Sequence, residues 1–124
     1  MKGSFQEGIR LFNSGKFFEA HEALEALWLK ADGGEKIFLH GLIQIAAAFH
    51  HYQRKNLVGF NSLLAKGSEK LMALGAARHE IDLARLRRDL AAWRDWLALG
   101  ESAGPTGAPP LPRIEPAAPR DRAG

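Results

Sequence analysis

Histidine, glutamate and glutamine side chains on two neighbouring segments form the pattern best suited to chemistry in this sequence. The candidate ligand-binding residues, which include one tryptophan, are His21, Glu22, Glu25, Trp28, His40, Gln44, His50 and His51. His21 and Glu25 are four residues apart and share a face if their segment is helical. His40, Gln44 and His51 step by four and seven residues, which also returns to one helix face. Imidazoles and carboxylates gathered in this way are typical components of metal, ligand and acid–base sites.

A metal site is one interpretation of this pattern. His21, Glu25 and His40 would provide two imidazoles and one carboxylate, a set that suits zinc or iron. The zinc-protease motif His-Glu-x-x-His is incomplete, however, because Glu25 stands where the second histidine is needed, and the paired Glu-x-x-His segments of di-iron bundles are absent. We therefore expect no cofactor and no metal ligands beyond these weak candidates, and the catalytic residues stay unassigned.

The same cluster supports a structural and a functional interpretation, and the sequence leaves both open. In a structural layer, the polar groups would hydrogen-bond to one another, because a buried polar group without a partner costs about 1 to 3 kcal/mol. In a binding site, they would contact a small molecule or a protein. We predict a binding or interaction module that is not an enzyme. The alternative is a metal-dependent or general-base hydrolase, in which Glu22 or Glu25 acts as the base together with His21.

An all-α bundle of about five helices is the predicted architecture that positions the cluster. Apolar residues recur at three- and four-residue spacing, and no strand pattern is visible. The predicted helices span about residues 4–13, 16–31, 35–55, 56–75 and 81–100. The third is apolar on nearly every side, which is typical of a central helix covered by others. Ser4 and Asn56 are the expected N-caps, and Gly67 indicates close packing or a bend in the fourth helix.

A short glycine-containing link makes the second and third predicted helices antiparallel neighbours. Counting outward from Gly33, this hairpin places Glu25 near the level of His40 or Gly41, and His21 or Glu22 near the level of Gln44. We therefore expect the two polar stripes to face each other inside the molecule. The end of the third helix would bring His50 and His51 near the first interhelical turn.

Two similar stretches join pairs of predicted helices. Residues 15–20 (GKFFEA) and 55–60 (KNLVGF) each resemble the tetratricopeptide turn, in which small residues let two antiparallel helices cross closely. The second stretch lacks the small residue at both ends. We expect tetratricopeptide-like helix pairs within a compact bundle.

Three strings in the chain resemble a known family. They are FNSGKFFEAHEALEALW, HGLIQIAAAFHH and NLVGFNSLLAKGSEKL. They are similar to the small all-helical family catalogued as domain of unknown function 309, over about residues 5–75. The resemblance implies a helical bundle and assigns no activity. The fifth helix and the tail lie outside it.

Composition limits the number of domains. The chain has 124 residues, of which 46% are hydrophobic, as expected for one globular domain, which we place at residues 1–100. All six prolines lie beyond residue 100. Residues 101–124 are therefore predicted to be a disordered tail rich in proline, alanine and arginine.

Charge and hydropathy limit the partners. The net charge of +3 is too small to favour a nucleic-acid partner, and no segment approaches the apolar length of a membrane span. The absence of cysteine fits a cytoplasmic location. Trp93 and Trp96 widen the apolar stripe of the fifth helix, so self-association through that helix is expected.

Overall fold

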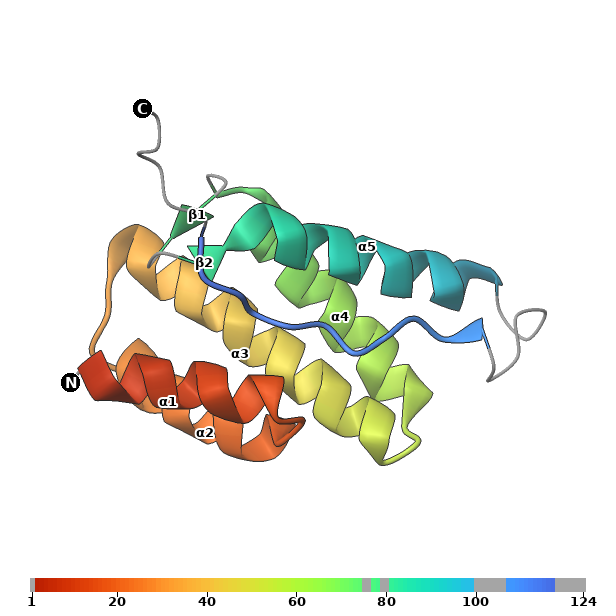
Figure 1. Cartoon of the computed structure of the whole chain (residues 1–124), viewed down its shortest axis with the longest axis horizontal. Coiled ribbons are helices and arrows are strands. Elements are labelled where there is room, and N and C mark those ends of the chain that lie inside the picture. The colour runs from red at the N-terminus through yellow and green to blue at the C-terminus, as the bar shows by residue number, and fades with distance from the viewer. Residues whose placement is uncertain (1, 75–76, 79–80, 100–106, 118–124) are drawn as a thin grey trace.

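The computed structural model describes residues 2–74, 77–78, 81–99 and 107–117, and within these ranges it is an all-α bundle with one small hairpin (Figure 1). The helices are α1 (Lys2–Asn13), α2 (Phe17–Trp28), α3 (Gly33–Gln53), α4 (Leu57–Met72) and α5 (Leu83–Leu99). The strands β1 (Ala77–Arg78) and β2 (Ile81–Asp82) pair in antiparallel fashion between α4 and α5. The predicted five-helix bundle is confirmed, whereas the hairpin was not predicted.

The predicted helix ends agree with the structure to within a few residues. Asn56 caps α4 as expected, because its Oδ1 accepts a hydrogen bond of 3.0 Å from the backbone N–H of Gly59. The helix α1 begins at Lys2, ahead of the predicted cap Ser4. The predicted end of α4 at Gly75 lies outside the described residues.

The two turns between paired helices have the same backbone geometry. Gly15, after α1, has φ 79°, and Lys55, after α3, has φ 65°. In each turn the backbone N–H of the following residue, Lys16 or Asn56, donates a hydrogen bond of 2.9 Å to the carbonyl oxygen five residues earlier. The left-handed conformation suits Gly15 and is strained at Lys55.

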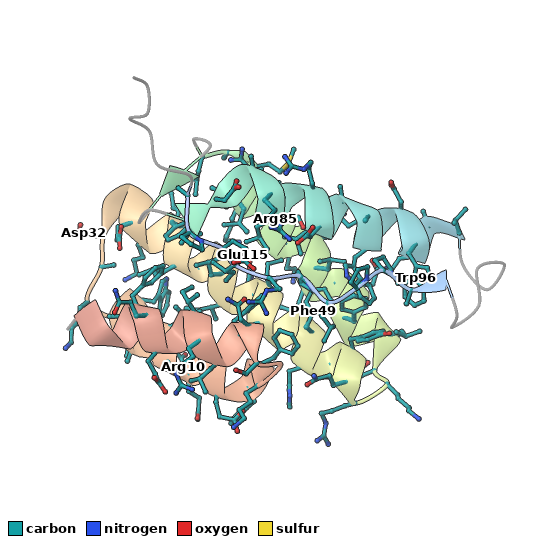
Figure 2. All side chains as sticks on the ribbon, in the orientation of Figure 1. Arg10, Asp32, Phe49, Arg85, Trp96 and Glu115 are labelled. Atoms are coloured by element: carbon teal, nitrogen blue, oxygen red, sulfur yellow. The ribbon has the colours of Figure 1, made fainter. Side chains whose placement is uncertain are left out.

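The helix α3 is the central element, and an aromatic cluster surrounds its second half. Phe49 is fully buried and lies in the interior of the bundle (Figure 2). Its ring centroid lies 5.6 Å from that of Phe17, 5.0 Å from Phe60 and 5.1 Å from Trp93. These contacts join α2, α4 and α5 to α3 through one side chain. The prediction that α3 is the covered, central helix is confirmed.

Small residues bring α3 and α4 close together. A Cβ atom added to Gly67 would lie 2.8 Å from Cδ1 of Ile45 and 3.0 Å from the carbonyl oxygen of Gly41. A Cβ on Gly41 would lie 2.8 Å from Cδ2 of Leu71. The close packing predicted at Gly67 is therefore present, and only glycine permits it without a shift of the neighbours.

Residues 107–117, which we call the strap, cross the bundle between α1 and α5 and run antiparallel to α5, back toward β2 (Figure 1). Ile114 is only 1% exposed and belongs to the hydrophobic core. The predicted disorder is therefore wrong for the strap, while residues 101–106 and 118–124 lie outside the described part of the chain. The prolines do exclude a helix, but composition gives no indication that helices distant in sequence bind the extended backbone.

Candidate functional site

Five of the eight predicted site residues lie along one line where α2 packs against α3, together with Phe18. We call this line the α2–α3 seam, and its residues are Phe18, His21, Trp28, His40, Gln44 and His50. At one end, the ring centroids of Phe18 and His50 are 5.3 Å apart. At the other end, those of Trp28 and His40 are 5.4 Å apart. The predicted antiparallel hairpin is thus correct, and both helices contribute rings to both ends.

The alignment of the two helices differs from the prediction by about one helical turn. His40 contacts Trp28, where the count from the link predicted Glu25 at this level. The link is the reason, because α2 ends at Trp28 and α3 begins at Gly33, so the connecting residues extend over a longer stretch than the predicted turn.

The glutamates of the predicted cluster are in solvent. Glu22 and Glu25 are exposed, so the prediction of a buried His/Glu/Gln cluster is wrong for the carboxylates. The buried residues of α2 are Phe17, Ala20 and Leu24, which occupy the side that faces the core. Because the apolar residues take this side, the glutamates are turned outward.

Two polar atoms of the seam are buried and lack a hydrogen-bond partner among the described residues. They are Nδ1 of His21 and Oε1 of Gln44. The residues themselves are only partly buried, so the atoms lie just beneath the surface. The expected hydrogen bonding within a sealed layer does not extend to these atoms. Both atoms therefore lack the hydrogen bond that nearly all buried polar atoms in folded proteins make.

The imidazoles at the two ends have lowered pKa values. Burial is the main cause at His40, followed by the positive charge of Lys70, and both lower its pKa. Burial is also the first cause of the lowered pKa of His50, before the charges of Arg54, His51 and His21. The surroundings of His40 and His50 therefore favour their neutral imidazoles, which can both donate and accept hydrogen bonds.

His51 and Trp28 have structural contacts. Nδ1 of His51 lies 3.1 Å from Nδ2 of Asn56, so the imidazole holds the residue that caps α4. Nζ of Lys36 lies 4.7 Å from the ring centroid of Trp28 and covers it in a cation–π contact. The predicted role of His51 in the cluster therefore receives no support from its contacts.

The structure does not bring the weak metal candidates together. His21 stacks on Phe18 with centroids 6.0 Å apart, whereas His40 contacts Trp28. Phe18 and Trp28 lie about 15 Å apart along α2 at 1.5 Å per residue. Among the described residues, no group of three or more histidine, cysteine, aspartate or glutamate side chains is placed to hold a metal ion.

Phe18 is the seam residue that was missing from the predicted site. Its side chain is 48% exposed, yet it contacts histidines of both helices. A cavity of about 430 Å³ beside it is lined in part by Lys16, Glu19 and His50. The available signal was an apolar residue three positions before His21, on the outer side of an amphipathic helix.

Comparison with known proteins shows that the part of the chain containing the seam is similar to a known family. Residues 5–63 match the family model of a domain of unknown function, DUF309. The predicted resemblance is thereby confirmed, and every seam residue falls within the matched range. The DUF309 match ends inside α4, so α5 and the strap lie beyond it.

A relative of known sequence extends the comparison. Uncharacterized protein YpuF of Bacillus subtilis (strain 168) is 36% identical to this chain over 69 residues, which are 54% of this chain. The chain covers 39% of the length of that relative.

Within the part of the chain that the structure describes, no helix combines the length and the hydropathy needed to span a bilayer.

Proposed function

We propose that this chain is a protein-interaction module whose α2–α3 seam binds an amphipathic helix of a partner protein. The observation that carries the proposal is the pair of buried, unpartnered polar atoms, Nδ1 of His21 and Oε1 of Gln44. A partner can supply hydrogen bonds to them once these partly exposed side chains rotate toward the surface, which removes a cost of about 1 to 3 kcal/mol per atom. Binding is then favoured over the uncovered state.

The exposed apolar side chains near the seam support a helical partner. Phe18 is 48% exposed on α2 and Ile37 is 47% exposed on α3. Two packed antiparallel helices form a groove between them, and amphipathic helices bind such grooves through apolar residues spaced by three or four. Glu22 and Glu25 are exposed on the α2 side, so basic residues are expected at the edge of the partner helix.

The hydrolase alternative lacks comparable support. A general base must reach the proton of a bound substrate, and catalytic carboxylates usually work inside a pocket. Glu22 and Glu25 are exposed, and the cavity that contains His50 includes neither of them. Self-association through α5 stays a prediction, and it now depends on the partly exposed Trp96, because Trp93 is buried.

A peptide selection tests the proposal. Amphipathic helical peptides selected against the full chain are expected to shift NMR signals of α2 and α3. The Phe18→Asp variant should weaken binding at least about tenfold in fluorescence anisotropy, because it places a charge in the desolvated centre of the contact.

Val58→Asp provides the matched control, because Val58 is 83% exposed at the start of α4 and should bind like the parent. Selected peptides that map to other helices, or equal losses in the two variants, would contradict a docking site at the seam.

A further inference from the structure

One side chain of the bundle binds the strap through its backbone. Nδ2 of Asn13 donates a hydrogen bond of 2.9 Å to the carbonyl oxygen of Ile114. The N–H of Ile114 donates one of 2.7 Å to Oδ1 of Asn13. A single amide thus satisfies both backbone groups of one residue, as a neighbouring strand would. Contacts of this kind recognise an extended backbone whatever its side chains.

Two further points hold the strap along its length. Nε1 of Trp93 donates a hydrogen bond of 2.9 Å to the carbonyl oxygen of Pro110. The N–H of Asp82 donates one of 2.8 Å to the carbonyl oxygen of Glu115. The donors come from α1, α5 and β2, so residues distant in sequence form one groove around an extended segment.

The side chains of the strap alternate between the groove and solvent. Pro112 and Ile114 are buried, whereas Leu111 and Arg113 are exposed. The groove therefore buries a proline and an aliphatic residue two positions apart, while the exposed Arg113 between them donates a hydrogen bond of 3.3 Å to the carbonyl oxygen of Asn13. Alternating pockets of this kind provide specificity in the recognition of extended peptides.

The proline-rich composition of the strap favours an extended conformation, so the segment does not have to fold in order to be recognised. Prolines at 109, 110, 112 and 116 fix the backbone and remove N–H groups, so the segment has few donors to satisfy. An extended proline-rich segment loses little conformational entropy on binding. An indole N–H that donates to a proline-rich backbone, as Trp93 does, belongs to the same mode of recognition.

We propose that the groove formed by α1, α5 and β2 is a peptide-binding site, and that the strap is its resident ligand. The competing ligand is an extended segment of a partner protein with the pattern Pro-x-Ile, as in residues 112–114. Such a segment can make the same backbone contacts once the strap leaves. No seam residue takes part, so this site is additional to the proposed function.

Tethering explains why the strap occupies the groove in the isolated chain. The strap follows α5 after a connection of residues 100–106, which gives it a high effective concentration at its own groove. A partner segment must exceed this effective concentration or bind more tightly. The strap therefore sets the threshold for partner binding.

A labelled peptide with the sequence of residues 107–117, added to the full chain, tests the site. Ile114→Asp in the chain should release the strap, and this variant should bind the peptide at least tenfold more tightly than the parent chain. Adding Asn13→Ala to it should weaken peptide binding at least tenfold. Leu111→Asp, at an exposed position of the strap, should behave like the parent. A peptide with aspartate at the isoleucine position should not bind.

Equal binding of the peptide by the parent and the Ile114→Asp chain, or binding by neither, would overturn the proposal. If the Ile114→Asp chain does not fold, a protease site in place of residues 101–106 allows the folded chain to be cut. The cut strap should then exchange with the labelled peptide while the helical circular dichroism is unchanged. Loss of the helical signal as the strap leaves would show a purely structural segment. Exchange only through dimers would show that the groove accepts a second copy of this chain.

Discussion

The α2–α3 seam and the strap differ in how their sequences relate to their burial. The two helices that form the seam have regularly spaced histidines and glutamates, yet Glu22 and Glu25 are in solvent. The strap has the composition of a disordered tail, yet Ile114 is 1% exposed. Spacing shows which residues share a helix face, whereas burial depends on which face finds a partner. The difference teaches that neither periodicity nor composition alone determines contact with the core.

The polar groups of the two regions also differ in whether they have hydrogen-bond partners. In the strap, Asn13 satisfies both backbone groups of Ile114. In the seam, buried atoms of His21 and Gln44 have no partner among the described residues. The strap is thus a completed contact, and the seam is an incomplete one. The following predictions test this contrast, in order of decreasing effect.

Removing the ring at the centre of the core, which belongs to neither region, should have the largest effect. Phe49→Ala is expected to lower the free energy of unfolding by about 3 to 5 kcal/mol, because it leaves a cavity between Phe17 of α2 and Trp93 of α5. Urea denaturation measures the change. Phe18→Ala, at a half-exposed ring, should cost about 1 kcal/mol or less. Similar losses for the two variants would contradict the assigned core.

Removing the amide that holds the strap should have the next largest effect. Asn13→Ala is expected to cost about 1 to 3 kcal/mol, because the N–H and carbonyl of Ile114 lose their partners. Hydrogen exchange at the Ile114 amide should accelerate at the same time. Ser14→Ala removes an exposed hydrogen bond to the Arg10 carbonyl and should leave that exchange unchanged. An unchanged Ile114 amide in the Asn13 variant would mean that the strap is held elsewhere.

Making the seam apolar should have little effect or a small stabilising one. Gln44→Leu removes a buried acceptor that lacks a partner, so the free energy of unfolding should stay the same or rise by up to about 1 kcal/mol. A hydrogen-bonded polar layer predicts the opposite, a loss of about 1 to 3 kcal/mol. Thermal unfolding of the variant distinguishes the two. A loss in that range would restore the structural layer and remove the main support for a docking site.

The pH dependence of the seam should be the smallest effect. Burial and Lys70 lower the pKa of His40 below its ordinary value of 6.5. The unfolded chain therefore binds this proton more tightly, and stability falls as the pH drops through 6.5, until it reaches the lower folded-state pKa. Replacing His40 with glutamine should reduce the loss of Tm between about pH 7.5 and about pH 5.5.

Lys70→Met provides a second test of the same titration. It removes a charge that lowers the pKa of His40, so it should also reduce the loss of Tm. An unchanged or larger loss in both variants would show that His40 does not titrate as its surroundings indicate.

Much of the fold was predictable from the sequence. The five helices, the cap at Asn56 and the central place of α3 follow from apolar spacing and capping residues, which act within one or two turns. The antiparallel pairing of α2 with α3 follows from their short link. The positions of the candidate residues on their helices were therefore correct, while their burial was only partly so.

Only the tertiary structure decided how these elements meet. The contact between Asn13 and Ile114 joins residues 101 positions apart, and no local pattern relates them. The displaced alignment of Trp28 with His40 follows from the longer link between α2 and α3, and the glutamates point outward because apolar side chains of α2 fill the core. Local spacing determines which groups share a face, because it depends on backbone geometry alone. Which face is covered depends on the packing of the whole chain, since burial is favourable only where complementary surfaces come together.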